Sequence, residues 1–123
     1  MDRILTGRSI LVVEDEPLIA IDIANAFTQA GARVLTVRSL RDALTAVEDG
    51  ALSAAVLDHA LGDGDSSQLC ARLKERNTPF VLHSGYSQLD GACGHGLQVE
   101  KPASPQVLVS AVQELLSTRS ISH

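Results

Sequence analysis

Short apolar runs alternate along this chain with longer stretches in which apolar residues recur every three or four positions. The apolar runs predict five strands, at residues 9–13, 32–36, 53–58, 79–84 and 97–99. The stretches between them predict helices, because residues with that spacing fall on one face of a helix. An alternation of strands and helices is typical of an α/β fold in which helices cover both faces of a parallel sheet.

Local signals mark where the helices begin and end. Pro17 suits the first turn of a helix, where its missing N–H would have no partner, and Gly31 ends this helix. Ser39 is a good N-cap residue and predicts the start of a second helix. Apolar spacing predicts the remaining helices over residues 67–76 and from residue 105 onward.

Residues 85–96 interrupt this alternation. The segment holds four glycines and an apolar pattern only one helical turn long. Because glycine loses more backbone entropy than any other residue on folding, a long helix is disfavoured here. We therefore expect the fourth helix of the fold to be short or disordered.

Length and composition restrict the class of protein. The 123 residues, 45% of them apolar, suffice for one domain but not for two, so we expect residues 1–123 to form a single domain. A formal charge of -5 argues against nucleic acid as a partner, because such binding depends on lysine and arginine. No apolar stretch is long enough to span a bilayer, and the first residues do not form a secretory signal. We therefore expect a cytoplasmic protein that makes no membrane contact.

Cysteine and histidine give little sign of a structural metal site. Cys70 and Cys93 are the two cysteines of the chain and form no CxxC pair, so we predict that both are reduced thiols. His59, His83 and His95 are isolated from one another in the sequence, and we interpret them as surface or partly packed side chains.

Polar side chains gather instead at the carboxyl ends of the predicted strands. They are Glu14 and Asp15 after the first strand, Asp58 and Ser84 at the ends of the third and fourth, and Lys101 after the fifth. In an open parallel sheet the functional crevice lies beyond these ends. We therefore expect three carboxylates, a hydroxyl and an ammonium to surround one cleft.

Three carboxylates in one cleft should have raised pKa values or recruit a cation. Two carboxylates about 4 Å apart repel each other by roughly 4 kcal/mol at an effective dielectric constant near 20. Oxygen ligands of this kind suit Mg²⁺, which completes its coordination with water and substrate phosphate oxygens. A phosphoryl group held there could be attacked by an aspartate carboxylate, with Lys101 and Ser84 available to stabilise charge on the transferred oxygens.

Four short strings carry a family resemblance: LVVEDEP at 11–17, VLDHAL at 56–61, LHSGY at 82–86 and EKP at 100–102. In this order, and at strand ends, they resemble the receiver domain of two-component response regulators over essentially the whole chain. The resemblance implies a doubly wound, flavodoxin-like sheet of five parallel strands in the order 2-1-3-4-5. Because 123 residues suffice for one domain only, we expect no output domain within residues 1–123.

The resemblance implies a role for each matching residue. The metal positions of the family correspond to Glu14, Asp15, Asp58 and the backbone carbonyl of Ala60, with the first usually acting through water. The residues of phosphoryl chemistry correspond to the phosphoacceptor Asp58, the switch residue Ser84 and the invariant lysine Lys101, whose bond to Pro102 is often cis in the family.

The resemblance also implies partners and a type of activity. A histidine kinase or a histidine phosphotransfer protein would supply the phosphoryl group to Asp58 in a Mg²⁺-dependent reaction. The chain would then signal through protein–protein contacts, with a downstream protein as a possible target. Such a protein is a signalling phosphoacceptor that catalyses only its own phosphorylation and dephosphorylation, and is not a conventional enzyme.

Three departures from the family pattern bear on function. Gln98 stands three residues before the lysine, where the family commonly has Tyr or Phe, which puts in doubt the usual coupling between an aromatic side chain and Ser84. Gly62 stands four residues after the phosphoacceptor, where proline is usual. The short spacing from Ser84 to Lys101, together with PFVLHSGY at 79–86, resembles the single-domain subfamily nicknamed FAT GUY.

Two other functions remain open from the sequence. An aspartate-nucleophile phosphohydrolase usually has a second acidic residue two positions after the nucleophile as general acid, and Ala60 occupies that position here. A degenerate receiver would act only as an unphosphorylated binding module. The acidic pair Glu14-Asp15, together with Asp58, argues against that interpretation.

Overall fold

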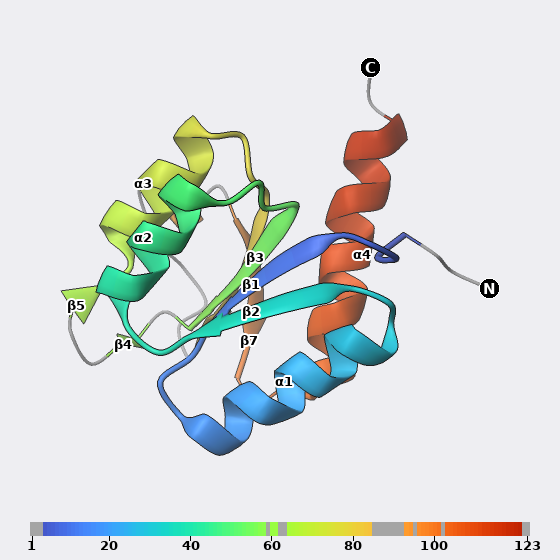
Figure 1. The fold of residues 1–123 in the computed structure, drawn as a ribbon, viewed down its shortest axis with the longest axis horizontal. Coiled ribbons are helices and arrows are strands. Elements are labelled where there is room, and N and C mark those ends of the chain that lie inside the picture. The colour runs from blue at the N-terminus through green and yellow to red at the C-terminus, as the bar shows by residue number, and fades with distance from the viewer. Residues whose placement is uncertain are drawn as a thin grey trace.

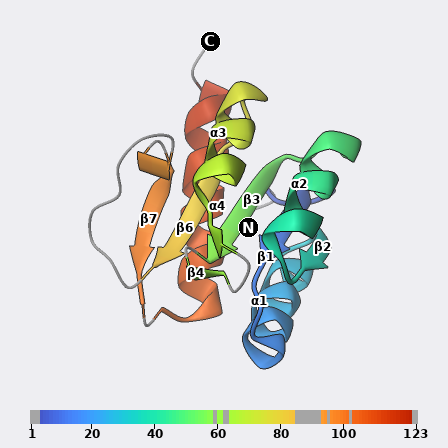
Figure 2. The ribbon, with the colours of Figure 1, turned by 90° about the vertical axis from the view of Figure 1, so that its left-hand side faces the viewer.

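Five parallel strands form the central sheet of the computed structural model, which describes residues 4–58, 60–61, 64–84, 93–94, 96–101 and 103–121. The strands are β1 (Ser9–Val13), β2 (Arg33–Val37), β3 (Ala54–Asp58), β6 (Phe80–Ser84) and β7 (Leu97–Glu100). Their order is β2-β1-β3-β6-β7, with β2 and β7 at opposite edges (Figures 1 and 2). Counted along the chain, this is the predicted order 2-1-3-4-5, which is confirmed.

Four helices of the described chain cover the two faces of this sheet. They are α1 (Pro17–Gln29), α2 (Leu40–Asp49), α3 (Ser67–Glu75) and α4 (Pro105–Ile121). Figure 1 shows α1 and α4 on one face and α2 and α3 on the other. Each pair closes its own apolar core: Phe27 of α1 and Leu108 of α4 belong to one, and Val47 of α2 and Leu73 of α3 to the other.

Two helix starts agree with the sequence signals. Pro17 is the first residue of α1. The Ser39 hydroxyl accepts a hydrogen bond from the Asp42 backbone N–H at 3.0 Å and so caps α2. At the end of α1, Gly31 has φ +96°, a left-handed conformation that glycine adopts readily. A Cβ at this position would lie 3.2 Å from the Thr6 Cα, so the close approach of two backbone segments also favours glycine.

The structure adds a small element after β3. The sequence predicts no strand between residues 58 and 67, but β4 (Ala60–Leu61) and β5 (Gly64–Asp65) pair as a two-stranded antiparallel ribbon. Two residues a strand are too few to show a periodic pattern in the sequence. The ribbon follows directly on the strand that ends in Asp58.

The expectation for the fourth helix falls mostly outside the described residues, because only 93–94 and 96 of the segment 85–96 are described. Cys93 and Gly94 form a 3₁₀ turn, and the Gly96 N–H donates to the Cys93 carbonyl at 3.1 Å. A Cβ at Gly96 would lie 2.4 Å from a ring carbon of Phe80. Glycine is therefore needed where this turn packs against β6.

The prediction of two reduced cysteines is wrong in this structure. Cys70 of α3 and Cys93 are joined by a disulfide, with their Cα atoms 5.0 Å apart. The pairing has no local motif because the two residues are 23 positions apart in the sequence. They meet because α3 and the turn before β7 pack into the same apolar core on one face of the sheet.

Two further features complete the fold. On the surface, Arg72 of α3 forms a two-bond ion pair with Glu48 of α2, one bond being 2.8 Å long, and so joins the two helices. Within the described chain, no helix combines the length and the apolar character needed to cross a membrane.

Candidate functional site

Three carboxylates meet beyond the carboxyl ends of β1 and β3. Glu14 and Asp15 directly follow β1, and Asp58 is the last residue of β3. Parallel pairing aligns Val13 with Leu57, so the two strands end at the same edge of the sheet. One oxygen from each of the three carboxylates lies within 4.8 Å of the others. We call these three residues the acidic cluster, and its assembly agrees with the expectation from the sequence.

Burial makes the acidic cluster electrostatically costly. Glu14 is 2% exposed and Asp58 is 5% exposed, whereas Asp15 is half-buried. Burial, together with a hydrogen bond and charge repulsion from Asp58, raises the pKa of Glu14 from 4.5 to about 7. The Glu16 N–H, 3.3 Å from Glu14 Oε2, opposes this rise. Near neutral pH the cluster therefore binds a proton readily, and a cation could take the place of that proton.

Lys101 supplies the positive charge next to the acidic cluster. Its Nζ donates a hydrogen bond to Asp58 Oδ1 at 2.9 Å. The Lys101 side chain is 35% exposed, so the ion pair extends from the buried Asp58 carboxylate to the surface. The backbone N–H of Lys101 donates to the Ser84 carbonyl at 2.8 Å, which continues the pairing of β6 with β7 beyond the end of β7. The lysine is therefore positioned by the sheet itself.

Ser84 ends β6 and is buried, with 2% of its surface exposed. The sheet register places His83 opposite Asp58, so Ser84 lies one residue beyond the position opposite the acidic cluster. In the other direction, Ser84 is paired with Glu100, the residue before Lys101. Ser84 therefore lies on the strand between β3, which carries Asp58, and β7, which Lys101 directly follows.

The remaining predicted residues are described only in part. Ala60 lies in β4, two residues after Asp58, and only its backbone belongs to the described structure. His59, Gly62 and Pro102 lie outside the described residues, and the predicted cis bond at Pro102 lies outside with them.

His83 is a buried polar residue that the sequence interpretation underestimated. It is 6% exposed, and neither ring nitrogen has a hydrogen-bond partner among the described residues. Burial and the positive charge of Lys101 lower the pKa of His83 below its ordinary value. The ring borders a cavity of about 270 Å³ between α1 and the start of α4. His83 lies inside the mostly apolar run that forms the wholly buried strand β6, and this place in the sequence was the signal that could have identified it.

Gln98 occupies the position where the family commonly has an aromatic residue. It lies on β7 opposite Leu82, and its side-chain carbonyl oxygen is buried without a partner in the described part of the chain. The structure thus places an amide, not an aromatic ring, on the strand that leads to Lys101.

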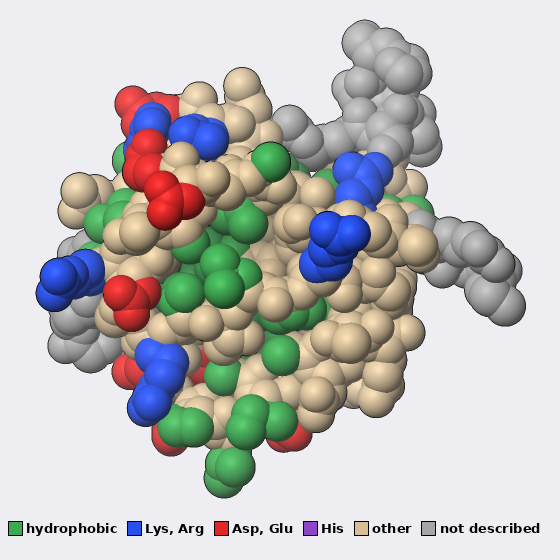
Figure 3. Space-filling view, viewed as in Figure 1, with side chains coloured by type: hydrophobic (Ala, Val, Ile, Leu, Met, Phe, Trp, Pro, Cys, Tyr) green, Lys and Arg blue, Asp and Glu red, His purple; other side chains and the backbone are tan. Residues whose placement is uncertain are grey.

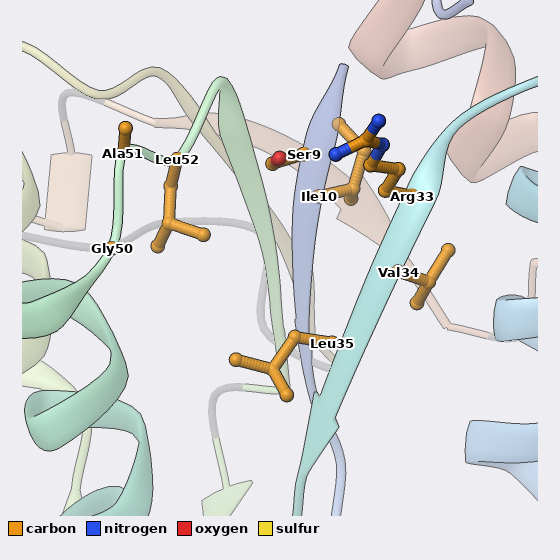
Figure 4. A pocket seen from close by; sticks show the side chains of 8 residues that line it. All are labelled: Ser9, Ile10, Arg33, Val34, Leu35, Gly50, Ala51 and Leu52. Carbon is orange, nitrogen blue, oxygen red and sulfur yellow. The ribbon is translucent and has the colours of Figure 1, made fainter. Parts of the chain in front are cut away.

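A second cavity, of about 210 Å³, lies at the opposite end of the sheet. Ser9 and Arg33, the first residues of β1 and β2, line it together with the loop after α2 (Figure 4). Leu35, which is 48% exposed, contributes an apolar wall, and hydrophobic side chains are visible on this face between α2 and β2 (Figure 3). Among the described residues that line the cavity, Arg33 alone is charged. The described residues that line this cavity include no carboxylate, so the cavity is separate from the acidic cluster.

Comparison with known proteins agrees with this geometry. The family described as the response regulator receiver domain matches residues 10–113. The transcriptional regulatory protein TcrA of Mycobacterium tuberculosis (strain ATCC 25618 / H37Rv) is 41% identical over 80 residues, which are 63% of this chain and 32% of TcrA. The chain thus spans about a third of the length of this curated relative.

Two crystal structures show the same fold. A response regulator receiver protein from Sinorhizobium medicae WSM419 has a TM-score of 0.82 at 28% identity, with 92% of this chain and 97% of that chain covered. A response regulator protein from Burkholderia pseudomallei, crystallised with a phosphorylated aspartic acid, a calcium ion and citrate, has a TM-score of 0.76 at 20% identity, with 94% and 72% covered. The relatives support the family and not the FAT GUY subfamily. The chain belongs to the response regulator receiver domain family.

Proposed function

We propose that this chain is the phosphoacceptor of a two-component phosphorelay, with Asp58 as the residue that takes the phosphoryl group. The observation that carries the proposal is the position of Asp58 between two kinds of charge. One carboxylate oxygen each of Glu14 and Asp15 lies within 4.8 Å of an Asp58 oxygen, and the Lys101 ammonium lies 2.9 Å from Asp58 Oδ1. A nucleophilic carboxylate with a cation beside it is suited to phosphoryl transfer, which depends on positioning and charge stabilisation.

The donor set fits Mg²⁺. This ion prefers oxygen ligands, and the acidic cluster offers a carboxylate oxygen from each of three residues. We assign Asp15, Asp58 and the Ala60 carbonyl as ligands, with Glu14 acting through water. Bound there, Mg²⁺ would neutralise negative charge on the transferred phosphoryl oxygens.

The residues of the chain then have separate tasks. Asp58 attacks phosphorus through one carboxylate oxygen and becomes an acyl phosphate, while the donor leaves with the electrons of the broken bond. Lys101 holds the Asp58 carboxylate in place and stabilises the charge on the incoming group. The Ser84 hydroxyl, on the strand between them, donates to a phosphoryl oxygen and couples phosphorylation to the end of β6.

We propose that the donor is a histidine kinase or a histidine phosphotransfer protein in the cytoplasm. The Burkholderia pseudomallei protein was crystallised with a phosphorylated aspartic acid, and a family of this kind typically comprises signalling phosphoacceptors. The net charge of -5 favours a protein as the downstream target over nucleic acid.

Intact-mass measurement tests the proposal. The chain is incubated with a small acyl phosphate donor, with and without Mg²⁺, beside the matched variant Asp58→Asn. We expect the mass of one phosphoryl group on the native chain with Mg²⁺, and none on the variant. Sustained release of phosphate from monoesters would indicate a phosphohydrolase instead, and an unmodified native chain would indicate a degenerate receiver.

A further inference from the structure

One partner of the Cys70–Cys93 disulfide lies in the sequence between Ser84 and Lys101, two residues of the proposed site. Cys93 follows Ser84 by nine positions and precedes Lys101 by eight. Cys70 is the fourth residue of α3, on the face of the sheet covered by α2 and α3. The bond therefore fastens Cys93, which lies between Ser84 and Lys101 in the sequence, to a helix that belongs to a different part of the fold.

Packing around the bond connects it to β6. Both cysteines are buried, at 0% and 3% exposure, in the apolar core that also contains Phe80. The Ser66 hydroxyl lies 3.7 Å from Cys93 Sγ. Gly96, which is hydrogen-bonded to Cys93, contacts Phe80 so closely that any Cβ would collide with the ring. The disulfide thus fixes Cys93, and through its hydrogen bond Gly96, against the strand that ends in Ser84.

The size of the domain does not by itself call for a structural disulfide. Small domains use disulfides when they cannot bury enough apolar surface, whereas this chain of 123 residues has an apolar core on each face of its sheet. In cytosolic proteins of ordinary organisms a disulfide is usually transient and serves catalysis or redox sensing. The two residues are also the only cysteines of the chain, so no third thiol competes for either partner.

We propose that Cys70 and Cys93 form a redox modification site that a dithiol reductant opens by thiol–disulfide exchange. We propose further that the open form lets Cys93 and Gly94 move more easily relative to β6 when Asp58 is phosphorylated. This second part rests on the proposed function. The closed form restrains Cys93 because the bond ties it to α3.

Reduction of the bond takes place in two exchange steps. A thiolate of the reductant attacks Cys93 Sγ, forms a mixed disulfide and releases Cys70 as a thiolate, which takes up a proton. The second thiolate of the reductant then displaces Cys93, which also takes up a proton. The chain gains two electrons and two protons, and the reductant leaves as a disulfide. We place the first attack at Cys93 because a short turn in a connection opens locally at a lower free energy than a helix.

The redox part is tested without any phosphoryl chemistry. The full chain is equilibrated in mixtures of reduced and oxidised dithiothreitol, quenched with acid and alkylated with N-ethylmaleimide for intact-mass measurement. We expect no adduct in oxidising mixtures and two in reducing mixtures, in one reversible transition. Two free thiols in every mixture would overturn the proposal, and so would a bond that stays closed in reducing mixtures while the chain is folded.

The coupling is tested by the rate of phosphoryl incorporation from a small acyl phosphate with Mg²⁺. We expect the oxidised chain to react at least about fivefold more slowly than the reduced chain, the lower end of typical allosteric coupling. The double variant Cys70→Ala with Cys93→Ala controls for effects of the dithiol on the donor and should react equally in both mixtures. If that variant does not fold, Cys93→Ser serves the same purpose.

Failure of the coupling and failure of the proposed function give different results. Equal rates for the oxidised and reduced native chain would overturn the coupling and leave phosphorylation of Asp58 intact. No incorporation in either form would contradict the proposed function, and the coupling would fail with it. The alkylation experiment involves no phosphoryl transfer, so its result depends neither on the coupling nor on the proposed function.

Discussion

Lys101 Nζ lies 2.9 Å from Asp58 Oδ1, so the carboxylate that we propose as phosphoacceptor is already paired with a cation. Asp58 is almost fully buried and has two acidic neighbours, and this single ammonium compensates part of their charge. The pair joins β3 to the chain just after β7, across the strand that carries Ser84. A phosphoryl group on Asp58 would therefore lie close to the ends of β3, β6 and β7 and would change the charge that Lys101 faces.

We predict that Lys101→Met slows phosphoryl incorporation by on the order of 100- to 1,000-fold, because it removes one donor that stabilises charge on the transferred oxygens. Intact-mass time courses with a small phosphodonor measure the rate. Lys74→Met is the matched control, because Lys74 is an exposed residue of α3 and should leave the rate unchanged. An unchanged rate in Lys101→Met would remove the lysine from the proposed chemistry.

The raised pKa of Glu14 predicts a pH dependence of stability in the absence of divalent cations. The folded chain keeps the Glu14 proton up to about pH 7, whereas the unfolded chain loses it near pH 4.5. The folded state therefore binds more protons between these values, and the free energy of unfolding falls as the pH rises through this window. The full loss is about 3 kcal/mol. Urea unfolding from pH 4.5 to 8 measures it.

The matched control for this dependence is Glu14→Gln, which cannot titrate at this position. The variant should lack the part of the pH dependence that belongs to Glu14, while other groups titrate as before. Parallel stability curves for the native chain and the variant would show that Glu14 is not the responsible group.

We predict that Mg²⁺ raises the melting temperature, because it binds the folded acidic cluster and relieves repulsion among its carboxylates. Saturation to about 100 times the dissociation constant stabilises a folded state by about 2.7 kcal/mol. Asp15→Asn removes one proposed ligand and should reduce the shift. Melting curves of the native chain that coincide with and without Mg²⁺ would count against the metal site.

Reduction of the disulfide should lower the free energy of unfolding by about 3 kcal/mol, because the bond closes a loop between residues 23 positions apart and restricts the unfolded chain. For a domain of this size the loss corresponds to a melting temperature lower by on the order of 10 °C. Thermal unfolding with and without a dithiol measures it. The Cys70→Ala and Cys93→Ala double variant should melt at one temperature in both buffers.

His83→Leu should stabilise the folded chain by about 1 kcal/mol, because it removes a buried imidazole whose two nitrogens have no partner within the described chain. Chemical denaturation at neutral pH measures the change. Leu82→Ala, a truncation at the neighbouring buried position, should instead destabilise the chain by several times as much. A destabilised His83→Leu variant would show that the imidazole is satisfied in solution.

Most of the sheet could be predicted from the sequence for a physical reason. Central parallel strands are buried on both faces and read as continuous apolar runs, as β3 and β6 do. The edge strand β2 carries more exposed side chains, and its predicted bounds of 32–36 are displaced by one residue from the observed Arg33–Val37. The acidic cluster could be predicted because its members end neighbouring strands.

The features that could not be predicted from the sequence depend on tertiary contacts or on very short elements. Cys70 and Cys93 pair only because a helix and a distant turn share one apolar core. The β4–β5 ribbon is too short to have a period. His83 is buried by α1 and α4 although its side chain is polar, and a single sequence shows only the polar character.

The position of the phosphoryl group on the chain shows whether Asp58 is the phosphoacceptor. After reaction with a small acyl phosphate and Mg²⁺, borohydride reduces an aspartyl phosphate to homoserine, and peptide mass spectrometry then locates the converted residue. We expect homoserine at position 58, only when Mg²⁺ is present during the reaction. A phosphoryl group found on a histidine, on a serine or on another carboxylate, with Asp58 unchanged, would contradict it.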